Sequence, residues 1–65
     1  MYISKSTAKR MLKDAGAARV SDEAAGVLQA KLDKLGYAAA TKAVSLANHA
    51  KRKTVEPSDI ELAFV

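Results

Sequence analysis

The central part of this 65-residue chain carries an apolar stripe that fits one very long helix. Apolar residues recur every three or four positions from Ala24 to Ala50, which is the spacing of one helix face rather than the alternation of a strand. A helix of about 28 residues is roughly 42 Å long. The short segments on either side are too small to cover it, so the pattern predicts a second copy of the chain against the stripe. The stripe consists of Ala24, Leu28, Leu32, Leu35, Ala39, Ala43, Leu46 and Ala50.

A shorter helix is expected before the long one. It is predicted from about Ser4 to Asp14, and Gly16 supplies the signal that ends it. Residues 16–20 then form a loop. No part of the chain shows the alternating pattern of a strand, which indicates an all-α protein.

The start and end of the long helix also carry recognisable signals. Ser21 stands where a capping residue is preferred, and the two residues after it are acidic, which suits the first turn of a helix. The helix is expected to end near His49. Pro57 then suits the first turn of a third, short helix. The sequence therefore predicts one domain, residues 1–65, with a short, a long and a short helix.

The chain has few ways to stabilise a small fold by itself. Domains of this length bury little apolar surface and commonly need a disulfide, a metal ion or a partner chain. The sequence has no cysteine and one histidine, which excludes a disulfide and an ordinary Cys/His zinc site. We therefore expect an obligate dimer, with no metal and no cofactor. The first residues lack the pattern of a secretory signal, so we expect a cytoplasmic protein.

The charge of the chain favours an anionic partner. Eleven Lys and Arg residues against seven Asp and Glu residues give a net charge of +4. Such a charge attracts an anionic polymer or an anionic membrane surface, and it does not choose between them. Most of the basic residues lie outside the long helix, in the first helix and the two loops. These are Lys5, Lys9, Arg10, Lys13, Arg19, Lys51, Arg52 and Lys53.

Four phrases of the sequence lie at the predicted loops and helix ends, with the separations found in one known family. They are KDAGA at residues 13–17, RVSD at 19–22, HAKRKTV at 49–55 and DIELA at 59–63. Through them the chain resembles the archaeal histones over almost its whole length. The resemblance implies the histone fold, in which two chains interlock head to tail as a handshake dimer and their long helices cross. It also implies double-stranded DNA as the partner, and a location on the chromosome, in the nucleoid.

The resemblance assigns most of the basic residues outside the long helix to duplex DNA. It implies that the first loop of one chain lies beside the second loop of the other, so that the basic residues form one ridge. Lys and Arg side chains and the N–H groups of helix starts would contact phosphates, which gives affinity without sequence choice. Arg19 would enter the minor groove. The expected DNA-binding residues are Lys9, Arg10, Lys13, Arg19, Ser21, Lys51, Lys53 and Thr54.

Two further features gain a role from the resemblance. Arg52 is expected to pair with Asp59 and to fix the second loop against the third helix. Gly36 lies inside a helix, where glycine costs about 0.5 to 1 kcal/mol relative to alanine, so it suits a point where two helix backbones approach closely. The expected residues of this central crossing are Leu32, Leu35, Gly36 and Ala39.

The resemblance also bears on assembly beyond the dimer. In histones that polymerise, the ends of the long helices and the third helices of two dimers form a four-helix bundle. A histidine there bonds to an aspartate of the neighbouring dimer. The residues of this chain that match the interface are Leu46, His49, Asp59 and Leu62. We therefore expect tetramers or larger assemblies on DNA.

The main hypothesis is an architectural protein that compacts or wraps duplex DNA as a homodimer. The alternative is a histone-fold chain that pairs with a paralogous chain in a transcription or replication complex. A membrane-surface peptide is disfavoured by the acidic residues along the chain and by the lack of tryptophan. An enzyme is least favoured, because the sequence has no cysteine nucleophile, no Gly-rich phosphate loop and no recognisable Ser/His/Asp arrangement. No small-molecule substrate is expected.

Overall fold

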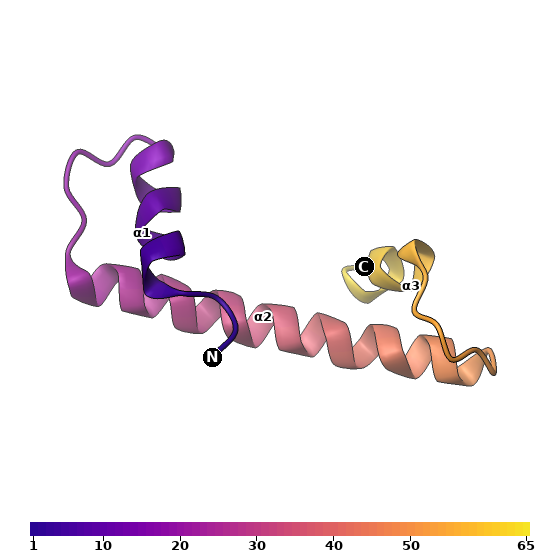
Figure 1. The fold of residues 1–65 in the computed structure, drawn as a ribbon. Helices are drawn as coiled ribbons and strands as arrows, with labels where there is room; N and C mark the ends of the chain where they lie inside the picture. The colour runs from indigo at the N-terminus through magenta and orange to yellow at the C-terminus, as the bar shows by residue number, and fades with distance from the viewer. The chain divides into compact units, whose positions relative to one another are not determined.

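The computed structural model describes residues 1–65 and contains three helices and no strand. Helix α1 spans Lys5–Asp14, α2 spans Asp22–His49 and α3 spans Pro57–Ala63 (Figure 1). The order of a short, a long and a short helix confirms the predicted all-α class, and the helix ends lie within about a residue of those predicted. No helix combines the length and the apolar character needed to cross a membrane.

The chain divides into two compact units, and the division falls within α2. The first unit, Met1–Lys34, contains α1 and the first part of α2. The second unit, Leu35–Val65, contains the rest of α2 and α3. Each unit is built around the part of α2 that it contains.

Hydroxyl groups begin the first two helices. Ser4 Oγ accepts a hydrogen bond from the Thr7 N–H at 3.1 Å, and Ser21 Oγ accepts one from the Ala24 N–H at 3.0 Å. Each bond satisfies one of the N–H groups that the start of a helix leaves without an intrahelical partner. The cap predicted at Ser21 is thus present in the structure.

In the first unit, the N-terminal end of α1 lies at the early turns of α2, and α1 runs away from α2 towards the loop (Figure 1). Ala8 of α1 and Ala25 of α2 are fully buried, whereas Leu12 and Leu28 are only half-buried. Small side chains allow two helix backbones to approach closely, but they remove little apolar surface from water. The contact between these helices therefore needs further support.

Asp33 of α2 supplies part of that support by fastening the segment that precedes α1. Its carboxylate accepts hydrogen bonds from the N–H groups of Ile3 at 2.7 Å and Tyr2 at 3.2 Å. Gln29, which is buried, donates to the same carboxylate at 3.4 Å. The hydrogen bond from Ile3 is the main reason why the pKa of Asp33 lies below its usual value.

The face of α2 that the chain itself covers differs in part from the predicted stripe. Ala39 and Ala43 are buried as expected for that stripe, and its leucines at 28, 32 and 46 are half-buried. The residues that the single chain buries on α2 are small or polar, and the stripe that we expect a second chain to cover stays partly exposed. Ala24, Leu35 and Ala50 are exposed, whereas Ala25, Gln29 and Ala47 are buried.

Helix α1 ends in a Schellman motif. The Gly16 N–H donates to the Lys13 carbonyl at 3.0 Å, and the Ala17 N–H donates to the Leu12 carbonyl at 3.1 Å. Gly16 has a φ of +118°, a conformation that glycine adopts without strain. The stop predicted at Gly16 is therefore explained by its backbone.

Helix α2 ends in the same motif with a lysine in place of the glycine. The Lys51 N–H donates to the Asn48 carbonyl and the Arg52 N–H donates to the Ala47 carbonyl, both at 2.9 Å. Lys51 has a φ of +61°, which is the left-handed region that residues with a β-carbon disfavour. The turn after α2 is thus well bonded and strained at one residue.

The same turn is held against the start of α3 by Arg52 and Asp59. Arg52 Nη1 and Nη2 donate to the two oxygens of Asp59, each at 2.9 Å, as a bidentate pair. Arg52 Nη1 also donates to the Thr54 carbonyl at 3.0 Å, and the Glu56 N–H donates to Asp59 Oδ2 at 2.8 Å. The Asp59 side chain is 4% exposed and that of Arg52 37%. The ion pair predicted from the sequence is therefore present and is partly buried.

We predict that Asp59→Asn lowers the free energy of unfolding at pH 7 and makes this free energy less dependent on pH in the acid range. The bond from Arg52, with that from the Glu56 N–H, lowers the pKa of Asp59 to about 2 in the folded protein. The ordinary value is about 3.9. A carboxylate whose pKa is lowered by folding stabilises the fold at pH values above its ordinary pKa. This stabilisation is lost as the pH falls from about 4 towards 2.

Denaturant unfolding followed by circular dichroism between pH 7 and pH 2 tests this. Wild type and Asp59→Asn should differ most near neutral pH and converge near pH 2, where protonated Asp59 resembles asparagine. Asp14→Asn is the control, because Asp14 is exposed and makes no ion pair, and it should leave stability at pH 7 unchanged. Parallel curves for wild type and Asp59→Asn would contradict the prediction.

Candidate nucleic-acid interface

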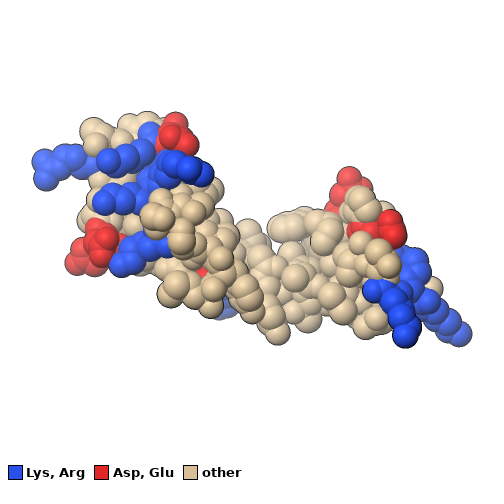
Figure 2. Space-filling model, in the orientation of Figure 1, with Lys and Arg blue, Asp and Glu red and all other residues tan.

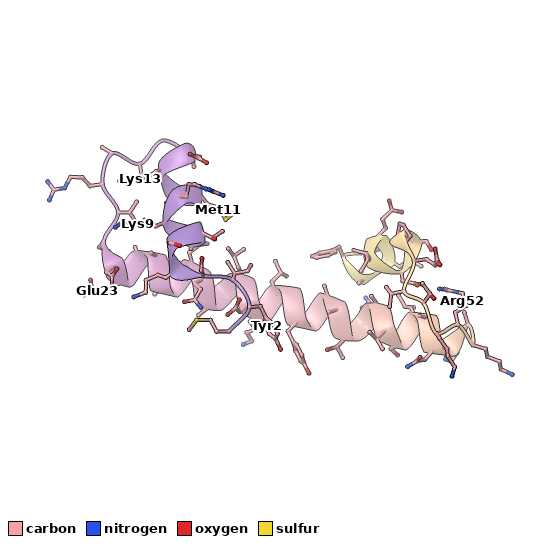
Figure 3. All side chains as sticks on the ribbon, in the orientation of Figure 1. Tyr2, Lys9, Met11, Lys13, Glu23 and Arg52 are labelled. Atoms are coloured by element: carbon pink, nitrogen blue, oxygen red, sulfur yellow. The ribbon has the colours of Figure 1, made fainter.

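Basic side chains of the first unit gather on α1 and the loop after it (Figure 2). Lys5, Lys9 and Lys13 are four residues apart, which places them on one face of the helix. Figure 3 shows Lys9 and Lys13 on the same side of α1, with Met11 on the other side. One face of α1 is therefore a row of ammonium groups.

Lys5 is the member of this row that serves the protein's own structure. Its Nζ lies 2.9 Å from Oδ2 of Asp22, so the bond joins the first residue of α1 to the first residue of α2. This hydrogen bond lowers the pKa of Asp22. Both side chains are largely exposed, so the pair adds little to stability. Lys9 and Lys13 have no ion pair within the chain.

Three other predicted DNA-binding residues lie in this unit. Arg10 on α1 and Arg19 in the following loop are exposed and make no ion pair. The Ser21 oxygen accepts the capping bond, and its hydroxyl hydrogen can still donate to an anion. The first turn of α2 carries Asp22 and Glu23, and their negative charge opposes the binding of an anion by the helix start. Arginine and lysine side chains must therefore supply most of the attraction here.

Basic side chains of the second unit gather in the turn that follows α2 (Figure 2). Lys51 and Lys53 are exposed and unpaired, whereas Arg52, labelled in Figure 3, is turned to Asp59. Thr54 accepts a bond from Arg52 through its carbonyl and is itself exposed. The turn thus presents two ammonium groups whose charge no neighbouring carboxylate neutralises.

The four residues predicted to join two dimers lie in the second unit, at the end of α2 and in α3. His49 is exposed, Leu62 is 54% exposed and Leu46 is half-buried. Asp59 differs from them because its carboxylate is buried and already accepts three hydrogen bonds. Two of these bonds end on Oδ2 and one on Oδ1. One of about four acceptor positions therefore stays open, on Oδ1.

The residues predicted at the central crossing have different environments in the single chain. Leu35 is 56% exposed, Leu32 is half-buried and Ala39 is buried. A β-carbon added to Gly36 would meet no atom within 4 Å, so nothing in the chain itself requires glycine there. The same is true of Gly26. Gly26 is half-buried and Gly36 is exposed, and the chain itself requires glycine at neither position.

Two contacts of this region were not found by sequence reasoning. Lys5 and Asp22 are 17 residues apart, and Asp33 is 30 residues from Ile3, so no local pattern connects them. No group of histidine and carboxylate side chains is placed to hold a metal ion. The chemistry that the unpaired Lys and Arg residues support is charge-assisted hydrogen bonding to anionic oxygens, as in contacts to nucleic-acid phosphates.

Comparison with known proteins finds relatives among the histones. Residues 1–64 match the family described as histone-like transcription factor (CBF/NF-Y) and archaeal histone. The chain is 46% identical over 55 residues to "Probable archaeal histone 3" of Methanocaldococcus jannaschii, an alignment that covers 85% of this chain and 82% of that protein. It is 43% identical over 54 residues to one of the subunits of the archaeal histone HAN1 of Thermococcus zilligii, covering 83% of this chain and 81% of that protein.

The family match and both relatives cover more than four fifths of the chain. The chain therefore belongs to the archaeal histone family, whose members are DNA-binding proteins with the histone fold and not enzymes.

Proposed function

We propose that this protein binds duplex DNA as a homodimer and compacts it through contacts to backbone phosphates, with little choice of sequence. The observation that carries the proposal is the set of basic side chains that stay exposed and unpaired on α1, in the loop after it and in the turn after α2. The fold itself uses Lys5 and Arg52, so the others are free for a ligand. These are Lys9, Arg10, Lys13, Arg19, Lys51 and Lys53.

The surface of the single chain supports dimerisation. The buried apolar residues of the single chain are all alanines, and its large apolar side chains stay half-buried or exposed. Interfaces of obligate homodimers bury such side chains and resemble a domain core cut in half. The exposed leucine and valine side chains of α2 supply apolar area for such an interface.

In a handshake dimer, the loop after α1 of one chain lies beside the turn after α2 of the other. Arg19 and Ser21 of one protomer then join Lys53 and Thr54 of its partner in one binding surface. Each dimer has two such surfaces, and the two α1 helices add Lys9, Arg10 and Lys13 between them. A duplex that follows this ridge bends around the dimer, which is how compaction arises. We place the protein on the chromosome, in the nucleoid, for the same reason.

We predict that DNA binding depends steeply on salt. With about 6 to 10 phosphates neutralised per dimer, affinity for a short duplex should fall by roughly 10³ to 10⁵ between 50 and 200 mM salt. Lys13→Ala removes one phosphate contact per chain and should reduce the slope of log affinity against log salt by nearly 2 per dimer. Lys42→Ala removes the same charge from α2, outside the ridge, and should leave the slope close to that of wild type. Titration curves that hardly move with salt would contradict the proposal.

We predict that the two open glycines of α2 respond in opposite ways to alanine. Gly26→Ala should stabilise the protein by about 0.5 to 1 kcal/mol, because alanine favours a helix interior. Gly36→Ala should instead destabilise the dimer, because the proposed crossing leaves no room for a β-carbon against the partner's backbone. Urea unfolding at several protein concentrations distinguishes a change in the stability of the dimer from a change in the stability of the single chain. If Gly36→Ala stabilised as much as Gly26→Ala, a close crossing at Gly36 would be ruled out.

We further propose that dimers associate through Leu46, His49, Asp59 and Leu62. The open acceptor position on Asp59 Oδ1 suits a donor from the neighbouring dimer, and His49 at the end of α2 is the donor that the family pattern supplies. The exposed Leu62 and half-buried Leu46 provide apolar surface around that bond. A count of acceptor positions supports the proposal, because a further bond on Oδ1 does not require the Arg52 pair to break.

Sedimentation of the free protein and of its complexes with a short duplex tests this assembly. The mass should grow in steps of two chains as protein is added at low salt, and the DNA should become more compact. His49→Ala should limit the complex to independent dimers while leaving the salt slope per dimer nearly unchanged. Growth by two chains in the His49→Ala variant would argue against a role for this histidine.

A second candidate function is pairing with a different histone-fold chain. Two observations favour it: the family description includes the CBF/NF-Y transcription factors, and the name of the Thermococcus zilligii relative makes it one component of a histone with subunits. Such a chain would be unfolded or insoluble when purified alone. A folded homodimer of the pure chain in the sedimentation experiment would exclude this candidate as the obligate state.

A further inference from the structure

The turn after α2 is closed by a residue in a disfavoured backbone conformation. Lys51, with its φ of +61°, is the one residue other than glycine with a positive φ. The two hydrogen bonds of the motif come from main-chain N–H groups, those of Lys51 and Arg52. The bonding of the turn therefore does not require a lysine side chain, and a glycine would make the same two bonds.

The turn after α1 shows that unstrained alternative in the same protein. Gly16 closes the same pair of hydrogen bonds, and its φ of +118° carries no penalty for a residue without a β-carbon. The two turns therefore differ in the residue that closes them and not in their hydrogen bonds. Lys51 has a β-carbon in the left-handed region, where it crowds the following carbonyl.

The charges around Lys51 indicate what the strained residue offers. Arg52 is neutralised by Asp59, so the positive charge that the turn presents comes from Lys51 and Lys53. The side chain of Lys51 makes no hydrogen bond or ion pair within the chain and is exposed. Replacing Lys51 would remove half of the uncompensated positive charge of the turn. Residues held in disfavoured backbone conformations commonly serve a function rather than stability.

We propose that Lys51 is a DNA-contacting residue kept at the expense of backbone strain, so that the turn exchanges stability of the fold for affinity to phosphate. The inference rests on the proposed function, since it takes the DNA backbone as the ligand of this turn. It goes further by assigning opposite effects on folding and on binding to a single side chain. A lysine that was only tolerated at this position would affect folding alone.

Lys51→Gly tests both effects in the whole protein. Unfolding without DNA should show an equilibrium constant for folding about fivefold higher per chain, because the strain is relieved. Each lost phosphate contact should weaken binding to a short duplex by about eightfold at 0.1 M salt, if the affinities of variant and wild type are taken as equal at 1 M salt. The slope of log affinity against log salt should fall by nearly 2 per dimer.

Two further variants separate charge from backbone. Lys51→Arg keeps the charge and the β-carbon, so it should bind like wild type and unfold like wild type. Lys53→Ala removes a neighbouring charge at a residue without positive φ, so it should weaken binding without the gain in stability. Only Lys51→Gly should move the two quantities in opposite directions.

The outcomes distinguish this inference from the proposal beneath it. If wild type shows no salt-dependent binding to duplex DNA, the proposed function fails. If wild type and Lys53→Ala behave as expected and Lys51→Gly binds as tightly as wild type, Lys51 does not contact DNA and this inference fails. If Lys51→Gly is no more stable than wild type, the strain assigned to the turn is absent and the exchange is overturned.

Discussion

The apolar interior that one chain can make for itself consists of alanine, and the rest of the structure depends on this. The buried apolar residues are all alanines, and no large side chain is fully buried. Burying a methylene group contributes about 0.8 kcal/mol, whereas ordering the backbone of one residue costs about 1 to 2 kcal/mol. An alanine interior cannot offset that cost over 65 residues. The leucines that could do so are half-buried or exposed on α2, where only another chain can cover them.

Carboxylates take over some of the positioning that an apolar core would otherwise provide. In the first unit, Asp33 holds the segment before α1 and Asp22 holds the start of α1. In the second unit, Asp59 holds Arg52 and the start of α3. Each carboxylate is engaged by N–H or ammonium donors of its own unit. The cations that remain unpaired are then available to a polyanion without weakening these contacts.

The helices could be predicted from the sequence almost to the residue because their signals are local. Ser21, Gly16 and Pro57 act through groups within a few positions of themselves, and so does the Arg52 pair seven residues from its partner. The buried face of α2 was less predictable, because alanine at positions 24 and 25 looks the same in a pattern of apolar residues. Packing under α1 decides between them. Asp33 and Asp22 contact residues that are 30 and 17 positions away in the sequence, and no periodic pattern predicts contacts at such separations.

Positive φ at Lys51 was also beyond sequence reasoning, since lysine is not a residue that marks a left-handed turn. The phrase around it suggested a loop, and only the backbone shows that the loop is a continuation of the helix-ending motif. The role of Gly36 differs again. Its surroundings in the single chain are open, so its meaning depends on a molecule that the chain alone does not contain.

The ending of α1 and α2 by main-chain hydrogen bonds has a consequence for how such a protein can change over generations. Main-chain N–H and carbonyl groups close the turn after α2, so the exposed side chains of Lys51 and Lys53 are not needed to end that helix. Substitutions at these two positions can change the charge of the turn while α2 still ends at the same residue. The helix-ending motif thus sets the length of α2 separately from the charge that the following turn presents, so the two properties can vary independently.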